Sequence, residues 1–560
     1  MRPARDLPAA PAYLLLALAL GLHFNRLAPL LPLHLHEFDA VHLYLPAARE
    51  LLAQGPAFFL QERSIHSPPL AYAWPMLVGA SVERFELANA VLSGIVLLLV
   101  FRCAQLMHSR IAGVAAALLF ATNPLMPPFF AAPVTEAPFI FWCAAWLWGM
   151  CEWIRDRRAW ALALAAVGIC CAALTRAPMF YGMVLLFVLT TAIAWRVRAR
   201  PGPRAVAMPM AVAFGLALLP PLAFIAKNLV VFGFPFYATG AGNQLYLGNN
   251  PLTGGYDPTY LGLIFDVGAI ARDMSPLTLE AERLLRGAAR VIFADKDAAF
   301  FASLHAKKLL AFVFVTNAEP GALALRTWRI ALMVLGGLGL AAIADRRLRW
   351  ALAGMFLFLV AIHVPVHYTH RFSVSSMDLW LVVAAGVGLA SLVEASWPRR
   401  WVALGLVAAG IAAGFLAYDK GGRPMADVFA AGRLEVWESG PLRGAGASEV
   451  AVENTKWFRG FNQHVLVLEV SAGSCKRLRV SYRPRGGGDW FAAPAMPVPS
   501  HGRVQLGSSW LRLEGEGLLR IACDVPGTLA LDRAAVYASL GAIDYRERFL
   551  GEKPLLPVER

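Results

Sequence analysis

The sequence predicts a polytopic α-helical membrane protein of about 11 transmembrane helices, followed by a C-terminal β-sandwich domain outside the membrane. Three observations support this prediction: the composition, a series of apolar segments, and a change of pattern near the C-terminus. Of the 560 residues, 58% are hydrophobic and 16% are charged, and the mean hydropathy is +0.55. A soluble domain of this size would not stay so apolar over most of its length.

Eleven apolar segments have lengths that suit membrane spans. They occupy residues 9–31, 86–106, 111–125, 135–154, 160–174, 178–195, 205–230, 327–343, 350–366, 377–392 and 401–418. The first resembles the core of a signal peptide, but it lacks a clean small-residue cleavage site and many further segments follow it. We therefore expect it to be retained as the first span, with the N-terminus in the cytoplasm.

The distribution of arginines predicts the sidedness of these spans. The net charge is +14 and the isoelectric point is about 9.7. Alternation of sides places the arginine-rich connections in the cytoplasm, in agreement with the positive-inside rule. These arginines are Arg102, Arg110, Arg155, Arg157, Arg158, Arg196, Arg198, Arg200, Arg204, Arg346, Arg347, Arg349, Arg399 and Arg400. Because no nucleic-acid-binding motif accompanies them, the charge does not indicate a DNA- or RNA-binding protein.

The same alternation places three large segments on the outer side of the membrane. The first two are outer loops at residues 34–82 and 232–326, both within a transmembrane domain at 1–418. The third is a separate outer domain at 419–560. We expect this domain to be periplasmic, in a multi-pass protein of a bacterial inner membrane.

Two of the outer segments have recognisable local patterns. Residues 277–311 of the second loop have the spacing of amphipathic helices that lie on a membrane surface. The C-terminal segment has short runs of alternating apolar residues separated by Gly and Pro, which is typical of a β-sandwich. This segment also contains Cys475 and Cys523, which can form a disulfide if it faces an oxidising compartment.

The first outer loop holds the strongest candidates for chemistry. Residues 44–55 have helical spacing, and Glu37 and Asp39 stand just ahead of this helix. Carboxylates at the N-terminal end of a helix commonly cap it, and for these two acids that alternative stays open. Their position at a membrane exit also suits a catalytic base.

Further ionisable residues stand at the outer ends of the predicted spans. They are Glu136, Arg176, Lys227 and Arg371. Charges at membrane depth usually face a cavity or a partner, although for each one alone an interfacial snorkelling residue is at least as good an interpretation. Cations beside acids suit a lipid phosphate that leaves while a carboxylate activates the incoming group. Among nearby cations, Arg63 is expected to help hold Asp39 ionised.

In their order and sidedness, these motifs resemble those of GT-C superfamily glycosyltransferases of the bacterial protein O-mannosyltransferase and lipid A aminoarabinose transferase type. The resemblance covers about residues 9–418 and does not include the C-terminal domain. The matching positions are the acids Glu37 and Asp39, the helix that begins at Tyr44, Pro68-Pro69-Leu70, Thr175-Arg176, Lys227-Asn228, Gly248-Asn249-Asn250-Pro251 and His370-Arg371.

The resemblance implies an inverting transferase that moves a sugar from a polyprenyl-phosphate donor to an acceptor of the cell envelope, which is a lipid, a glycan or a protein. It implies Asp39 as the base, with Glu37 as the alternative, because relatives place the acid four residues before the tyrosine, where this chain has Ala40. The implied phosphate contacts are Arg176, Arg371 and Lys227, with Arg63 or His66 in place of a lysine that relatives carry. The implied substrate contacts are Tyr44, Glu136, Asn249 and Asn250.

No cofactor is expected, since the sequence contains no P-loop, no Rossmann fingerprint and no compact metal-ligand signature. The first-loop histidines His34, His36, His42 and His66 can in principle bind Zn²⁺, but ordinary interfacial or substrate-contacting roles are preferred. Two other functions stay open: a polyprenyl-lipid transporter or flippase, and a ligase or polymerase of lipid-linked glycans. A transporter would favour an internal repeat, which this sequence lacks, and a ligase would not need an acid in the first loop.

Overall fold

The computed structural model describes most of the helical part of the chain and the strands of the C-terminal part. The described residues are 6–31, 39–249, 270–271, 275, 277–314, 323–366, 370–417, 433–439, 441–445, 447–453, 464–484, 490–492, 496–498, 502–507, 516–524 and 526–539. By their internal packing these residues belong to two units. Unit 1 combines Met1–Thr239 with Leu309–Arg423, and unit 2 combines Gly240–Lys308 with Pro424–Arg560.

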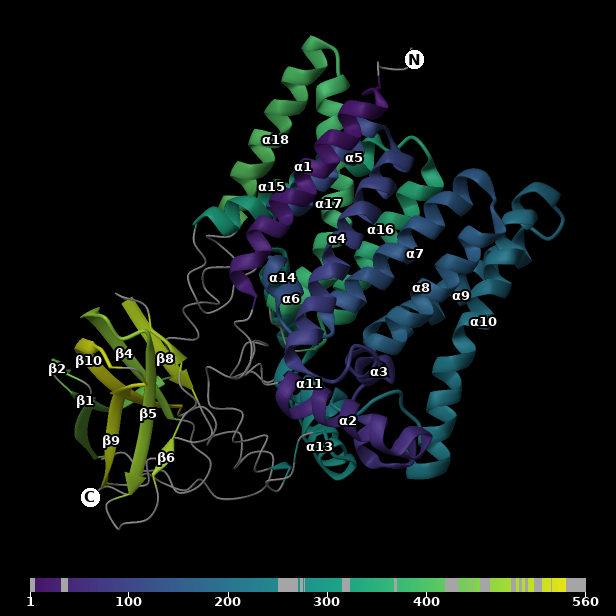
Figure 1. Ribbon diagram of the computed structural model, residues 1–560. Helices are drawn as coiled ribbons and strands as arrows, with labels where there is room; N and C mark the ends of the chain where they lie inside the picture. Colours follow the sequence, from purple (N-terminus) through teal and green to yellow (C-terminus); the bar gives the residue numbers. More distant parts are fainter. Residues whose placement is uncertain are drawn as a thin grey trace. The chain divides into compact units, whose positions relative to one another are not determined.

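Unit 1 is a bundle of apolar helices (Figure 1). Its helices are α1 (Ala9–Leu27), α2 (Leu45–Gln54), α3 (Leu70–Leu77), α4 (Val82–Met107), α5 (Arg110–Thr122), α6 (Pro127–Ala131), α7 (Glu136–Asp156), α8 (Ala159–Thr175), α9 (Pro178–Arg196), α10 (Pro201–Phe232), α15 (Leu323–Ala342), α16 (Arg346–His363), α17 (His370–Glu394) and α18 (Trp397–Ala417). Helix α14 (Ala298–Phe314) crosses from unit 2 into unit 1.

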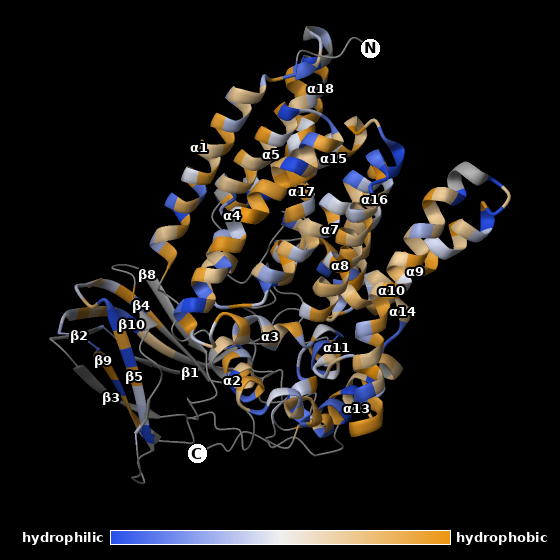
Figure 2. Cartoon of the chain, turned by 45° about the vertical axis from the view of Figure 1, so that its right-hand side comes forward, coloured by the Kyte–Doolittle hydropathy of each residue, from blue (hydrophilic) through white to orange (hydrophobic). Residues whose placement is uncertain are grey.

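The prediction of a polytopic helical membrane protein is confirmed. A helix overlaps each of the eleven predicted spans, and among the described residues eight helices are long and apolar enough to cross a membrane. Helices α5 and α8 are apolar but shorter, and α16 begins with arginines. Figure 2 shows the apolar residues covering these helices, with hydrophilic residues gathered toward their ends.

Helices α7 and α17 form the centre of the bundle, because 83% of the apolar window of each is buried. Small residues allow α17 to approach its neighbours closely, as is common where membrane helices pack. A Cβ atom on Gly386 would lie 2.8 Å from the carbonyl oxygen of Ala112 in α5, and Gly339 of α15 has no room for a Cβ beside Ala384.

Contacts between segments distinguish the two ends of the bundle. At one end, called here the first-loop end, residues 39–66 contact the N-terminus of α17 and the C-terminal turn of α10. At the opposite end, Glu394 of α17 accepts hydrogen bonds from His108 and Ser109, which follow α4. Arg157, in the turn after α7, also lies at that opposite end. It is close enough to Arg347 and Asp345 for both to shift its pKa. These contacts agree with the alternation of sides expected from the sequence.

An ion pair joins α15 and α17 inside unit 1. Arg329 and Asp378 contact each other with both side chains fully buried. Asn123, at the end of α5, donates from Nδ2 to Asp378 Oδ2 over 2.9 Å, and Arg329 donates to Ser373. Charges at this depth are stable only when paired and hydrogen-bonded, so the network connects three helices through one site.

In unit 2, helices α11 (Ala241–Asn249) and α13 (Leu279–Asp295) pack on each other. Helix α13 buries Ala281, Leu285, Ala288 and Ile292, which recur at spacings of three and four residues, so its predicted amphipathic character is confirmed. The fully buried carboxylate of Glu282 accepts hydrogen bonds from the backbone N–H groups of Gly240 and Gly242, at the start of α11.

The C-terminal part is β-structure, as its alternating pattern predicts. The described strands are β1 (Arg433–Ser439), β2 (Leu442–Ala445), β3 (Ala447–Glu453), β4 (His464–Gly473), β5 (Arg477–Pro484), β6 (Phe491–Ala492), β7 (Met496–Pro497), β8 (Gly502–Gly507), β9 (Glu516–Cys523) and β10 (Thr528–Ser539). They form two antiparallel sheets, one ordered β1-β10-β4-β8 with β2 beside β10, the other ordered β3-β9-β5-β6 with β7 beside β5. The predicted disulfide between Cys475 and Cys523 is confirmed.

The buried ion pair generates a prediction about stability. Replacing Arg329 by Met, or Asp378 by Leu, removes one partner of the buried ion pair and should destabilise unit 1 by about 3–5 kcal/mol. The double substitution removes both charges and should recover most of this loss. Thermal unfolding of the purified protein in detergent would measure the effect; a double variant less stable than both single variants would contradict it.

Candidate functional site

Two acids and two arginines meet at the first-loop end of unit 1, and we call this group the acid–arginine cluster: Asp39, Glu136, Arg176 and Arg371. Arg371 contacts Asp39 Oδ2 through Nη1 and both carboxylate oxygens of Glu136, with Nη2 lying 3.1 Å from Oε2. Arg176 Nη1 donates to Glu136 Oε1 over 2.7 Å. The cluster therefore balances two negative and two positive charges.

The ends of three membrane helices position the cluster. Glu136 is the first residue of α7, where the unpaired N–H groups of the first turn favour an anion. Arg176 directly follows α8, where the C-terminal end of the macrodipole favours a cation. Arg371 is the second residue of α17, an unfavourable place for a cation, and its two carboxylate contacts compensate for that.

Asp39 immediately precedes a single π-helical turn, Ala40–Tyr44, which leads into α2. The capping alternative for Asp39 is not borne out, because its side chain makes no capping hydrogen bond to this turn and contacts Arg371 instead. The cation beside Asp39 is therefore Arg371, whereas Arg63 pairs with Glu50 over 2.6 Å. Glu37, the alternative base, lies outside the described residues.

Exposure separates the roles open to the two acids. The side chain of Glu136 is fully buried, whereas that of Asp39 is 30% exposed. The two arginines lie between these values, and the Arg176 guanidinium is also placed over the rings of Phe139 and Phe372. A molecule that enters from solvent can therefore reach Asp39, while Glu136 is placed to hold both arginines.

Tyr44 lies close to Asp39, Arg371 and Glu136 of the cluster. It is buried against Thr135, whose hydroxyl lies 3.3 Å from the Tyr44 oxygen, and it packs in a core with Tyr72 and Phe58. Burial, together with the nearby Asp39, raises the pKa of Tyr44 to about 12. At neutral pH it is thus a neutral phenol that can donate a hydrogen bond.

A second group of candidates, the Lys227 group, lies nearby along the first loop. Lys227, in the last turns of α10, donates to Ser64 Oγ over 3.2 Å and lies 4.2 Å from the centre of the Phe224 ring. Ser64 stands between Arg63 and His66, the two residues proposed to replace a family lysine. Burial lowers the pKa of His66 to about 4, so any contact it makes at neutral pH uses an uncharged imidazole.

Asn249 belongs to unit 2. It is buried at the end of α11, where its Oδ1 lies 3.2 Å from His305 Nε2 and its Nδ2 donates to the carbonyl of Leu245. Lys308 donates to the carbonyl of Gly248 over 2.7 Å, and burial lowers the pKa of this lysine to about 7. Asn250 lies outside the described residues.

No group of three or more His, Cys, Asp or Glu side chains arranged to hold a metal ion is present among the residues that the structure describes. Three of the first-loop histidines fall outside that description: His34 and His36 entirely, and His42 in its side chain.

Two further ionisable residues lie inside predicted spans. Asp378 and Arg329 each lie inside an apolar segment predicted to span the membrane, where an ionisable residue implies a partner. Their pairing with each other required the spatial adjacency of α15 and α17, since 49 positions of sequence numbering separate them.

No protein-family model and no curated protein matches this chain. Among solved structures, the oligosaccharyltransferase of Archaeoglobus fulgidus in its apo form is 14% identical, with a TM-score of 0.41 over 75% of this chain and 55% of that one. The archaeal oligosaccharyltransferase AglB from the same organism, in complex with an inhibitory peptide and a dolichol-phosphate, is 15% identical, with a TM-score of 0.40 over 75% and 55%.

The present chain thus spans about half the length of these structures. At such identities and TM-scores the similarity carries no argument about the activity of this chain.

The buried His66 predicts a pH-dependent stability. Its folded pKa of about 4 lies below the ordinary value of 6.5, so the unfolded chain binds a proton more readily between these values. Stability from this residue is complete above pH 6.5 and is lost as the pH falls toward 4, by at most about 3 kcal/mol before solvent screening.

Replacing His66 by Gln, which cannot be protonated, should flatten this part of the pH profile. Melting temperatures of the wild-type protein and the variant, measured from pH 7 to pH 4, provide the comparison. Parallel profiles would show that the His66 imidazole is solvated in the folded protein.

Proposed function

We propose that this chain is a membrane glycosyltransferase of the GT-C type, which transfers a sugar from a polyprenyl-phosphate donor to an acceptor of the cell envelope with inversion. The observation that carries the proposal is the acid–arginine cluster. A partly exposed carboxylate, Asp39, lies against Arg371 at the ends of membrane helices, where a lipid-borne donor and an acceptor from water can meet.

The reaction assigns a clear task to Asp39. The acceptor hydroxyl oxygen attacks the anomeric carbon of the sugar, and the bond from that carbon to the phosphate oxygen breaks. The bonding pair leaves with the polyprenyl phosphate, and the acceptor proton passes to the Asp39 carboxylate. Within the described residues, Arg371 is the hydrogen-bond partner of Asp39 and engages Oδ2, so Oδ1 is available for this proton.

The arginines suit the departing phosphate. Each guanidinium carries five N–H donors, stays charged when desolvated and contacts phosphate in a bidentate manner. Glu136 orients both Arg371 and Arg176 without being exposed itself. We assign Lys227, Arg63 and neutral His66 to further donor contacts along the first loop, and Tyr44 to substrate binding.

The proposed location is a bacterial inner membrane, with the first-loop end and unit 2 on the periplasmic side. The arginine-rich turns, including Arg157 and Arg347 near each other, then face the cytoplasm. No nucleotide is required by the step described above, because the donor already carries its leaving group.

Two other functions are compatible with a membrane helix bundle. A polyprenyl-lipid flippase would use the same cations to bind phosphate but would have no use for an accessible carboxylate beside them. A ligase or polymerase of lipid-linked glycans would be expected to place its chemistry in a large outer loop. The variants below separate these functions, because Asp39 has a task only in the proposed transferase.

The Asp39→Asn variant should lower the transfer rate by about 10²–10⁴, since the amide keeps the size of the side chain but cannot accept the proton. Transfer from a defined polyprenyl-phosphate sugar, followed by mass spectrometry of the acceptor, measures this loss. Binding of the donor should persist. Glu83→Gln is the control, because Glu83 is an exposed acid in the first turn of α4 and belongs to none of the groups assigned above.

Glu37→Gln tests the alternative base. If Asp39→Asn retains near-normal transfer and Glu37→Gln does not, the base is Glu37. If both variants transfer sugar at the normal rate, the proposed function is wrong, and lipid transport becomes the favoured alternative.

The proposed orientation predicts the accessibility of engineered cysteines. A membrane-impermeant thiol reagent should label Asp532→Cys, in the exposed part of β10, in intact spheroplasts. It should label Arg200→Cys, in the turn before α10, only after permeabilisation. The reverse pattern would contradict the orientation and, with it, the access of a periplasmic acceptor to Asp39.

A further inference from the structure

An open groove lies between α8 and α10, and one of its ends, at Arg157, is far from the acid–arginine cluster. Its volume is about 1030 Å³, and its walls are almost entirely apolar. On α8 it is lined by residues from Ala159 to Cys171, and on α10 by residues from Met208 to Pro220. Each stretch is thirteen residues long, which corresponds to about 18 Å along a helix axis.

The groove exists because small residues face it from both helices. Ala159, Ala163 and Ala166 recur along one side of α8, and Ala213 and Ala217 occupy the matching side of α10. Where larger side chains would meet and fill the space, these alanines leave a slot. The slot length suits one extended hydrocarbon chain of a phospholipid.

The groove opens toward the lipid-facing surface of the bundle. Val167, Val212 and Leu216 line it and are each more than half exposed. Both helices belong to the membrane-spanning part of unit 1, so the medium at this surface is hydrocarbon rather than water. An acyl chain is therefore the occupant that matches both the shape and the polarity of the groove.

A cation stands at one end of the groove. Arg157 lines it, in the left-handed turn between α7 and α8, and donates from Nη1 to the carbonyl of Trp153 over 3.1 Å. In the described part of the chain no carboxylate forms an ion pair with it, whereas its neighbours Arg155 and Arg158 both pair with Asp156.

The surroundings of Arg157 disfavour its positive charge, so a bound anion would stabilise it. Burial lowers the pKa of Arg157, and Arg347 acts in the same direction, with Asp345 opposing them. Basic residues at the end of an intramembrane groove are a recurrent binding arrangement for anionic lipid head groups. Charge and shape thus identify the same ligand from two independent observations.

We propose that this groove is a binding site for an anionic phospholipid, whose phosphate contacts Arg157 and one of whose acyl chains lies between α8 and α10. This site is distinct from the donor site. Glu136 begins α7 and Arg157 follows its last residue, so about 30 Å of helix separates the phosphate from the acid–arginine cluster. The inference does not rest on the proposed transferase activity.

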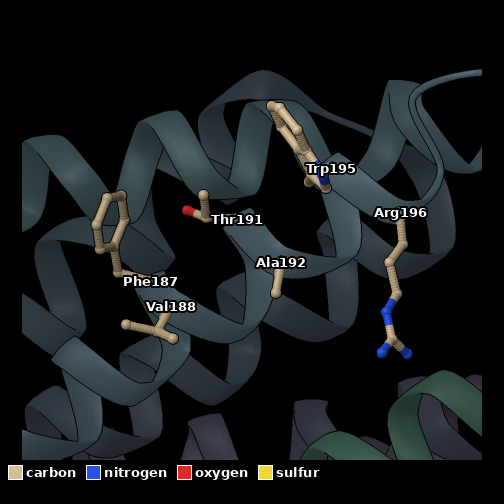
Figure 3. Close-up of a pocket in the computed structure, with 6 residues that line it drawn as sticks. All are labelled: Phe187, Val188, Thr191, Ala192, Trp195 and Arg196. Carbon is tan, nitrogen blue, oxygen red and sulfur yellow. The ribbon is translucent and has the colours of Figure 1, made fainter.

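A hollow on α9 provides the contrast. Its volume is about 420 Å³, and its lining residues Phe187, Val188, Thr191, Ala192, Trp195 and Arg196 all come from that one helix. Figure 3 shows that Arg196 points away from the Trp195 indole. A cation and apolar side chains are present here too, but no second helix completes a slot, so we expect no specific lipid.

The test compares lipid retention by variants of these two places. Wild-type protein and the variants Arg157→Gln, Ala163→Phe and Arg196→Gln are reconstituted in nanodiscs of equal parts phosphatidylglycerol and phosphatidylcholine, then extracted in mild detergent. Native mass spectrometry counts the phospholipids that remain bound to each molecule. Size-exclusion chromatography and circular dichroism establish that each variant is folded.

Wild type and Arg196→Gln should retain one phosphatidylglycerol in preference to phosphatidylcholine. Arg157→Gln should lose this preference by about ten-fold, the effect of one charge-assisted contact. Ala163→Phe, which fills the slot, should lose both lipids. Equal retention of the two lipids by wild type, an unchanged preference in Arg157→Gln, or displacement of the lipid by millimolar inorganic phosphate would overturn the proposal.

Discussion

The guanidinium of Arg371 holds the candidate site together. It carries a positive charge at the N-terminal end of α17, where the helix dipole opposes it, and at a depth where an unpaired charge is costly. Its contacts to Glu136 and Asp39 remove that cost and connect the first loop to α7 and α17. Removal of this one group would leave a fully buried carboxylate, Glu136, with a single cation.

The same constraint operates deeper in α17. Asp378 lies seven residues after Arg371, two helical turns along nearly the same face, and pairs with Arg329 of α15. Helix α17 thus carries a cation at its N-terminal end and an anion in its interior, and each forms an ion pair with a residue outside the helix. Helix α17 is also closely packed, with Gly386 against α5 and Gly388 against α15, so the two ion pairs and these close contacts act on the same helix.

The two ends of the bundle differ in how their arginines are paired with acids. At the first-loop end, acids compensate the arginines, and the least buried acid is the one with an oxygen available for chemistry. At the opposite end, Arg157 has no acid of its own in the described part of the chain, and the apolar groove beside it is open to lipid. A site for proton transfer needs a balanced cluster, whereas a site for a lipid anion needs an excess cation.

Hydropathy and residue alternation were sufficient to predict the apolar helices and the β-structure, since each is a periodic property of a single segment. The identity of Asp39, Glu136, Arg176 and Arg371 as polar residues at span ends was likewise visible in the sequence. Their mutual pairing was not: Arg63 was the expected partner of Asp39, and Arg371, more than 300 residues away, is the one in contact. Only the packing of α7, α8 and α17 decides which charges meet, because an ion pair depends on distances in space that local sequence patterns do not encode.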